Sequence, residues 1–212
     1  MPAKPEPSAP PPARPNLALV YLRHRLARYR RFWIFFTATV LLDQASKLAV
    51  LAWLPPSYDR TGFLNPPFEV IPDFFNLVHV YNTGAAFSML SGQSVFLFAF
   101  AIAALVIIFR YRRSFELERK SVQLAFGLLT GGIAGNAIDR LLYGHVVDFI
   151  DVNPPGYGFL VKTFLGWSEH SRWPAFNIAD SAICIGVILY VVLNILFPTK
   201  NNALSAAPDT PE

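Results

Sequence analysis

The sequence contains very little cysteine and little charge for its length. One residue of the 212 is a cysteine, Cys184, so no internal disulfide can form and the redox compartment stays undetermined. Cys184 lies in an apolar run, and we interpret it as a small core residue. Only 15% of the residues are charged, whereas 53% are hydrophobic, and the mean hydropathy is +0.37. Such a chain predicts segments that span a bilayer.

Patterns typical of metal sites and of nucleic-acid binding are also missing. The four histidines are far apart and no His-Glu-x-x-His motif occurs, so we expect no metal site. A formal net charge of +4 would suit nucleic acid. The basic residues, however, gather beside apolar runs, as the topology signals of membrane proteins do. We therefore expect contact with membrane lipids and no nucleic-acid partner.

The composition divides the chain into four parts. Residues 1–16 are rich in proline and alanine and predict a disordered tail. Residues 17–31 form a basic juxtamembrane segment, residues 32–197 the membrane domain, and residues 198–212 a disordered C-terminal tail. A cleaved signal peptide is the alternative for the first apolar run. No small-x-small cleavage site follows that run, and the apolar pattern resumes after Lys47.

Four apolar segments predict four transmembrane helices. They run from about Phe32 to Leu54, Ser94 to Phe109, Ser121 to Ile138 and Ile178 to Phe197. In the third segment Gly127, Gly131 and Gly135 recur at a spacing of four, which predicts close approach of another helix.

Basic residues predict the orientation of these helices in the membrane. Arginines and lysines concentrate within residues 23–31 and 110–120, which places both termini and the second loop in the cytoplasm. The first loop then faces outward, and its aromatic and β-branched residues between Phe63 and Leu90 predict short strands. The expected fold class is an all-α membrane protein with four transmembrane helices and a small extracytoplasmic β-sheet between the first two.

Polar residues in or near the apolar runs fall in five stretches: Asp43–Lys47, Asn82–Phe87, Gly135–Arg140, Gly144–Phe149 and Phe176–Ser181. The first lies within the first predicted helix, and the other four lie at or beyond the outward ends of the predicted helices. Polar groups in or near lipid are costly, and chance would scatter them over both faces of the bilayer. Their common level predicts a functional site.

Several of these residues also have simpler structural interpretations. Asp43 and Lys47 lie four apart on one helix and are expected to neutralise each other. Asp139 and Arg140 end a helix, where the arginine is expected to act as a clamp or interfacial anchor rather than in catalysis. His145 has no obvious partner and is expected at the surface or behind the site.

The remaining polar positions differ in how well structure alone explains them. Asn177 suits a helix N-cap, and Asp180 three residues later suits the positive end of that helix. Asn82, before Gly84, suits a turn. Asp148 has the weakest structural explanation, because no lysine or arginine stands beside it in the sequence.

Two carboxylates are the natural acid and base of this set. A serine nucleophile would need a nearby base, and Ser88 and Ser181 have none in their motifs. Two aspartates at close range share a proton, because both cannot ionise easily. The ionised member can activate water while the protonated member polarises a carbonyl, which is peptide hydrolysis without a covalent intermediate.

From about Phe32 to Phe197 the chain resembles lipoprotein signal peptidase, or signal peptidase II, a bacterial family of membrane aspartic peptidases. Five motifs carry the resemblance in the family's order: DQASK at 43–47, YNTGAAFS at 81–88, GNAIDR at 135–140, GHVVDF at 144–149 and FNIADS at 176–181. The resemblance implies Asp148 and Asp180 as the catalytic pair. It implies that the following residues line the site and orient the pair or the substrate: Asn82, Asn136, Asp139, Arg140 and Asn177. It also implies Asp43, Lys47 and Gly84 as structural support.

The resemblance further implies the substrate and the cellular location. The substrates would be prolipoproteins carrying diacylglycerol on a cysteine, cleaved on the N-terminal side of that cysteine. The enzyme would lie in the bacterial plasma (inner) membrane with its site at the extracytoplasmic face. We expect a monomer that needs no cofactor and is inhibited by a cyclic lipopeptide such as globomycin.

The segment 153–172 is long for the family and predicts an outer lid or membrane-surface element. Its apolar residues are Phe159, Leu160, Phe164, Leu165 and Trp167.

Two other functions are possible alternatives to a peptidase. A proton-coupled transporter would use the aspartates as a relay, although a relay should spread them over the full depth of the membrane. A membrane chaperone without catalytic activity would keep its function when either aspartate is replaced by alanine.

Overall fold

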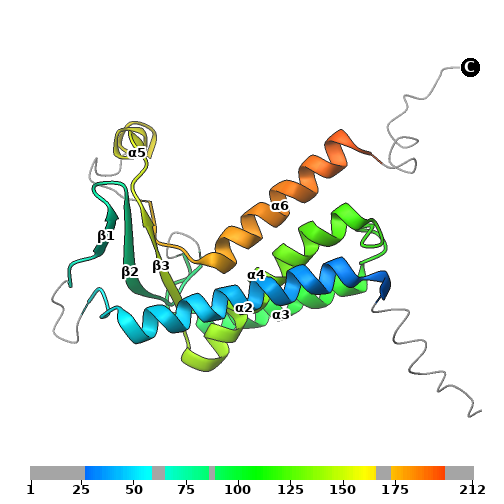
Figure 1. The fold of residues 1–212 in the computed structure, drawn as a ribbon, viewed down its shortest axis with the longest axis horizontal. Coiled ribbons are helices and arrows are strands. Elements are labelled where there is room, and N and C mark those ends of the chain that lie inside the picture. Colours follow the sequence, from blue (N-terminus) through cyan, green and yellow to red (C-terminus); the bar gives the residue numbers. More distant parts are fainter. Residues whose placement is uncertain (1–26, 59–64, 86–88, 166–172, 199–212) are drawn as a thin grey trace, which may run out of the picture.

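A computed structural model describes residues 27–58, 65–85, 89–165 and 173–198 of the chain. The predicted tails and residues 17–26 of the basic segment lie outside these ranges, apart from Pro198. Four long helices lie roughly along one another, and a small sheet stands at one end of them (Figure 1). The helices are α2 (Arg30–Trp53), α3 (Ser94–Arg110), α4 (Lys120–Tyr143) and α6 (Ile178–Leu196).

Three of these helices, α2, α4 and α6, are long and apolar enough to cross a membrane. Helix α3 is the most apolar of the set but has 17 residues. At 1.5 Å per residue it is about 26 Å long, slightly shorter than a hydrocarbon core of ~30 Å. The prediction of spanning helices is therefore confirmed for three segments, and the fourth crossing stays a prediction.

Helix α4 lies at the centre and packs against both α2 and α6. Its glycines allow this, because an added Cβ would collide with the neighbouring helix. A Cβ on Gly131 would lie 2.8 Å from Cβ of Thr39 in α2, and one on Gly132 would collide with the carbonyl oxygen of Ala179 in α6. The glycine spacing thus brings three helices together where the polar residues begin.

The sheet is antiparallel with strand order β1-β2-β3. Strands β1 (Phe68–Ile71) and β2 (Phe75–Asn82) come from the loop in which strands were expected. Strand β3 (Val146–Val152) follows α4 and pairs with β2, so the prediction that the sheet lies entirely between the first two helices was incomplete. The pairing sets Val80 opposite Asp148 and Asn82 opposite Val146, which carries an aspartate from a distant segment to Asn82.

The long loop after β3 contains a short helix, α5 (Tyr157–Leu165), on the sheet side of the molecule (Figure 1). Phe159 and Leu160 are exposed there, whereas Trp167 lies outside the described residues. A lid or membrane-surface role for this segment stays a prediction. Cys184 is exposed on α6, so its interpretation as a core residue was wrong. In a helix surrounded by lipid an apolar neighbourhood does not require burial within the protein.

Candidate active site

Asp148 is held in the middle of β3, almost completely buried, by two amide groups from distant segments. Asn82 of β2 donates from its side-chain nitrogen to Oδ2 at 2.9 Å, and Asn177 donates to Oδ1 at 2.8 Å. Only 2% of Asp148 is exposed. A buried carboxyl is tolerated when its oxygens are hydrogen-bonded, and here each oxygen has one donor.

Asn177 and Asp180 form a capping box at the start of α6. The Asn177 side-chain oxygen accepts from the backbone N–H of Asp180 at 2.9 Å, and Asp180 accepts from the backbone N–H of Asn177 at 3.2 Å. The prediction that Asn177 is the N-cap of this helix is confirmed. Its amide nitrogen remains available for Asp148, so one side chain caps the helix and also connects the two aspartates.

Asn136 connects Asp180 to the interior of the helix bundle. Its side-chain nitrogen donates to Asp180 Oδ1 at 2.7 Å. Its side-chain oxygen accepts from Lys47 Nζ at 2.9 Å and from Asn177 at 3.2 Å. Because these donors occupy its oxygen, the Asn136 amide is oriented with its NH₂ group toward Asp180.

Lys47 lies between two carboxylates inside the bundle. Its Nζ is 2.8 Å from Asp43 Oδ2 on the same helix and 2.8 Å from Asp139 Oδ2 on α4. The expected neutralisation of Asp43 by Lys47 is therefore found in the structure, with Asp139 as a second partner. Asp43 also accepts from the backbone N–H of Ala179 at 2.9 Å, which ties α2 to the first turn of α6. Such a buried set is costly to break, because any remaining charge would be unpaired.

Arg140 and Gly84 lie on the side of the site nearest Asn82. The Arg140 guanidinium donates to the Gly84 carbonyl at 2.8 Å and to the Asn136 carbonyl at 3.3 Å. The Gly84 N–H donates to the Asn82 side-chain oxygen at 2.9 Å, which is the turn expected for Asn82. Arg140 thus clamps the segment after β2 onto α4, as its structural interpretation predicted.

The structure brings all ten predicted site residues into one network and adds Gln44. Its side-chain nitrogen donates to Asp139 Oδ1 at 2.8 Å and lies 3.2 Å from both Asp43 Oδ2 and the Gly135 carbonyl. A polar side chain inside an apolar span was the available signal. His145, expected at the surface or behind the site, stacks edge-on against Tyr81 with ring centroids 4.4 Å apart.

Burial and charge act together on Asp148. Desolvation, followed by the nearby charge of Asp180, raises the pKa of Asp148 from its ordinary value of 3.8 to about 7. The amides of Asn82 and Asn177 and the charge of Lys47 oppose the rise. A carboxyl with a pKa near 7 can hold or release a proton at physiological pH, as an acid–base catalyst must.

The fold and the site define a helical membrane protein with buried carboxylates and amides concentrated at one end of its helices. Among the described residues, no cluster of three or more histidine, cysteine, aspartate or glutamate side chains could hold a metal ion.

Comparison with known proteins assigns this arrangement to a family. The family model for signal peptidase (SPase) II matches residues 35–197. A lipoprotein signal peptidase of Aeromonas hydrophila is 40% identical over 81% of this chain and 91% of its own length. One from Janthinobacterium is 38% identical over 75% and 85%. Two solved structures of bacterial membrane enzymes align with TM-scores of 0.61 and 0.60, at 32% and 35% identity. They cover 84% and 78% of this chain, and the alignments span 93% and 92% of theirs.

The chain belongs to the signal peptidase II family and is a peptidase. The resemblance drawn from its five motifs is confirmed.

Proposed function

We propose that this protein is an aspartic endopeptidase that removes signal peptides from diacylglyceryl-modified prolipoproteins, with Asp148 and Asp180 as its catalytic pair. One observation carries the proposal. The Asn177 side-chain nitrogen donates to Asp148 Oδ1 and the Asn177 backbone N–H donates to Asp180 Oδ2, so one residue hydrogen-bonds both carboxyl groups. No lysine or arginine neutralises either one through an ion pair within the described residues.

The environments of the two aspartates suggest different roles. Asp180 lies in the first turn of α6, and its two oxygens accept hydrogen bonds from Asn136 and from the backbone N–H of Asn177; we assign the ionised role to it. Asp148, with its pKa raised to about 7, is the member that keeps a proton near neutral pH. Ionised Asp180 takes a proton from water, the resulting hydroxide attacks the scissile carbonyl carbon, and Asp148 gives its proton to the carbonyl oxygen. On collapse of the tetrahedral intermediate the C–N bond breaks, the proton held by Asp180 passes to the leaving nitrogen, and one hydroxyl of the intermediate returns a proton to Asp148.

The surrounding polar residues orient this pair. Asn136 and the backbone N–H of Asn177 hold Asp180, while Asn82 holds Asp148. The other five predicted site residues sustain this geometry from behind or beside it: Asp43, Lys47, Gly84, Asp139 and Arg140. Fixed carboxyl positions matter because a small misplacement of reacting groups lowers the rate steeply.

The arrangement of charges supports an outward-facing site. The sheet lies at one end of the helices, whereas the start of α2, the end of α3 and the start of α4 lie at the other (Figure 1). The residues at those three helix ends are Arg30, Arg110 and Lys120. Positive residues favour the cytoplasm, so the site faces the extracytoplasmic side of the bacterial plasma membrane. The diacylglyceryl group of the substrate would hold the scissile bond at that interface, which converts a solution encounter into a nearly unimolecular one. We propose a monomer that requires no cofactor and is blocked by globomycin.

The test is cleavage of a diacylglyceryl-modified prolipoprotein by purified protein, followed as a shift to the mature form on a gel. Wild type is compared with Asp148→Asn and Asp180→Asn, each with its melting temperature measured in the same detergent. We expect cleavage by wild type alone. A folded Asn variant that cleaves at the wild-type rate would overturn the assignment of the pair. A wild type that fails on a substrate cleaved by another family member would overturn the function.

A further inference from the structure

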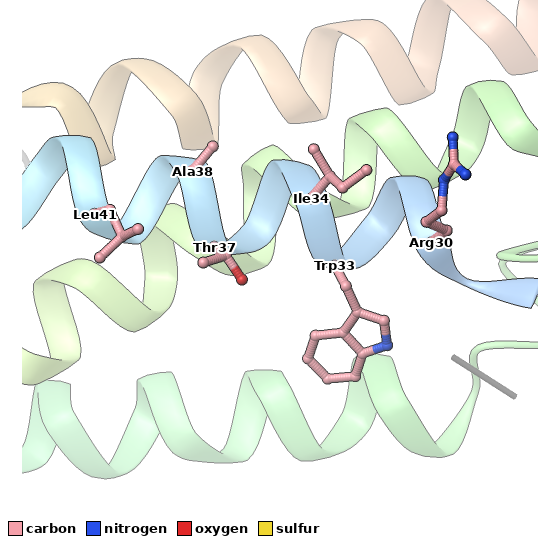
Figure 2. Close-up of a pocket in the computed structure, with 6 residues that line it drawn as sticks. All are labelled: Arg30, Trp33, Ile34, Thr37, Ala38 and Leu41. Carbon is pink, nitrogen blue, oxygen red and sulfur yellow. The ribbon is translucent and has the colours of Figure 1, made fainter. Parts of the chain in front are cut away.

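An open hollow of about 520 Å³ lies along the outer surface of α2, at the end of the helix that is far from the aspartates. Its walls are Arg30, Trp33, Ile34, Thr37, Ala38 and Leu41, all on one face of α2 (Figure 2). Ile34 and Leu41 are 52% and 63% exposed, so no other part of the described structure covers them. The hollow is shallow and open, so it suits a long chain lying along the helix rather than an enclosed small molecule.

The polarity of the hollow changes along its length. Arg30 stands at one end, the middle and far end are apolar, and Thr37 is the one uncharged polar residue among the six. Arg30 forms no ion pair with any described acidic side chain, whereas its neighbour Arg28 pairs with Glu118. The occupant is therefore expected to have an anionic group joined to a long apolar chain.

The length of the hollow matches one leaflet of a bilayer. Eleven residues separate Arg30 from Leu41, which at 1.5 Å per residue is about 17 Å along the helix. Half of a ~30 Å hydrocarbon core is about 15 Å. With Arg30 at the cytoplasmic interface, the apolar part of the hollow reaches to about the middle of the membrane.

Trp33 forms a fixed wall of the hollow. Its ring meets those of Phe32 and Phe36 edge-on, with centroids 5.0 and 5.8 Å away, and its indole points from α2 toward α3 (Figure 2). An indole next to an arginine is typical of the interfacial region of a bilayer. We propose that this hollow binds one anionic phospholipid of the cytoplasmic leaflet, with its phosphate on Arg30 and an acyl chain along Ile34, Ala38 and Leu41.

The test uses the full-length protein in detergent, with phosphatidylglycerol or phosphatidylcholine added and bound lipid counted by native mass spectrometry. We expect wild type to retain one phosphatidylglycerol in preference to phosphatidylcholine. Arg30→Gln should weaken that binding about fivefold, the factor corresponding to ~1 kcal/mol for one basic residue at an anionic surface. Arg31→Gln is the matched control, because it removes the same charge at the next residue but does not line the hollow.

A second variant tests the acyl-chain part. Ala38→Phe would place a ring in the hollow, and because Ala38 is exposed the fold should tolerate it. We expect this variant to bind less of either lipid while its melting temperature without lipid stays unchanged. Equal binding of the two lipids by wild type, or equal effects of Arg30→Gln and Arg31→Gln, would overturn the proposal. A dimer that Ala38→Phe dissolves would instead identify the hollow as a contact between two copies of the chain.

Discussion

Asn177 offers the sharpest test of the site, because its two roles can be separated by substitution. Asn177→Ser keeps a side-chain oxygen that can cap α6 but removes the amide that donates to Asp148. Asn177→Ala removes both. Both variants should therefore share any effect that depends on the amide and differ in any effect that depends on the cap.

The amide effect can be estimated from the hydrogen bond to Asp148. That bond lowers the pKa of Asp148 against the larger effects of burial and of Asp180. A hydrogen bond to a charged group contributes about 1.5–3 kcal/mol, and 1.36 kcal/mol corresponds to one pKa unit. Its loss should raise the pKa of Asp148 by about one to two units above the wild-type value of about 7.

The sign of the effect on activity follows from the role of Asp148. If its protonated form is the active one, wild-type kcat/KM falls as the pH rises through about 7. In both Asn177 variants this alkaline decline should move upward by about one to two pH units. Residual kcat/KM is measured between pH 5 and about 9.5 with a lipidated fluorogenic peptide, within the range where the detergent-solubilised protein stays folded.

The cap effect is measured separately as thermal stability. Asn177→Ala should be less stable than Asn177→Ser by about 0.5–2 kcal/mol, the usual contribution of an N-cap. An alkaline decline at the same pH in wild type and both variants would refute the assignment of the proton to Asp148. Equal melting temperatures of the two variants would refute the separation of the two roles.

Three further predictions concern the support of the site. Lys47→Met should destabilise the protein by about 3–5 kcal/mol, because it leaves two buried carboxylates without their cation; exposed Lys120→Met serves as the control in thermal unfolding. Gly132→Val should abolish cleavage and lower the yield of folded protein, because its Cβ would meet the Ala179 carbonyl, whereas exposed Leu141→Ala should behave as wild type in gel filtration and cleavage. Prolonged dialysis against a chelator should leave the cleavage rate unchanged, and a loss that added metal restores would contradict the aspartic mechanism.

The sequence predicts the helices and the residues of the buried polar network well, because both have strong local signals. Long apolar segments and glycines at a spacing of four are visible without any partner. A polar residue in an apolar span, such as Asp43 or Lys47, is also conspicuous because lipid makes it costly. The N-cap at Asn177 follows from its position before an apolar run.

The remaining features depend on contacts between distant segments. Strand β3 reads as a short apolar stretch after a helix, and only its pairing with β2 makes it part of the sheet. The second partner of Lys47, Asp139, lies on another helix and follows no fixed spacing. The exposure of Cys184 could not be predicted either, because apolar neighbours in the sequence do not distinguish a lipid-facing residue from one buried in the protein.

The capping box at the start of α6 has a consequence for biosynthesis. Asp180 lies in the last helix of the described chain and Asn177 caps it, and the hydrogen bonds at the start of this helix also position the two aspartates. A nascent chain that has inserted only α2, α3 and α4 therefore lacks Asp180, the proposed catalytic partner of Asp148, and the amide of Asn177. Proteolytic capacity would be withheld until the final helix enters the membrane, which would protect neighbouring membrane proteins from a half-made protease.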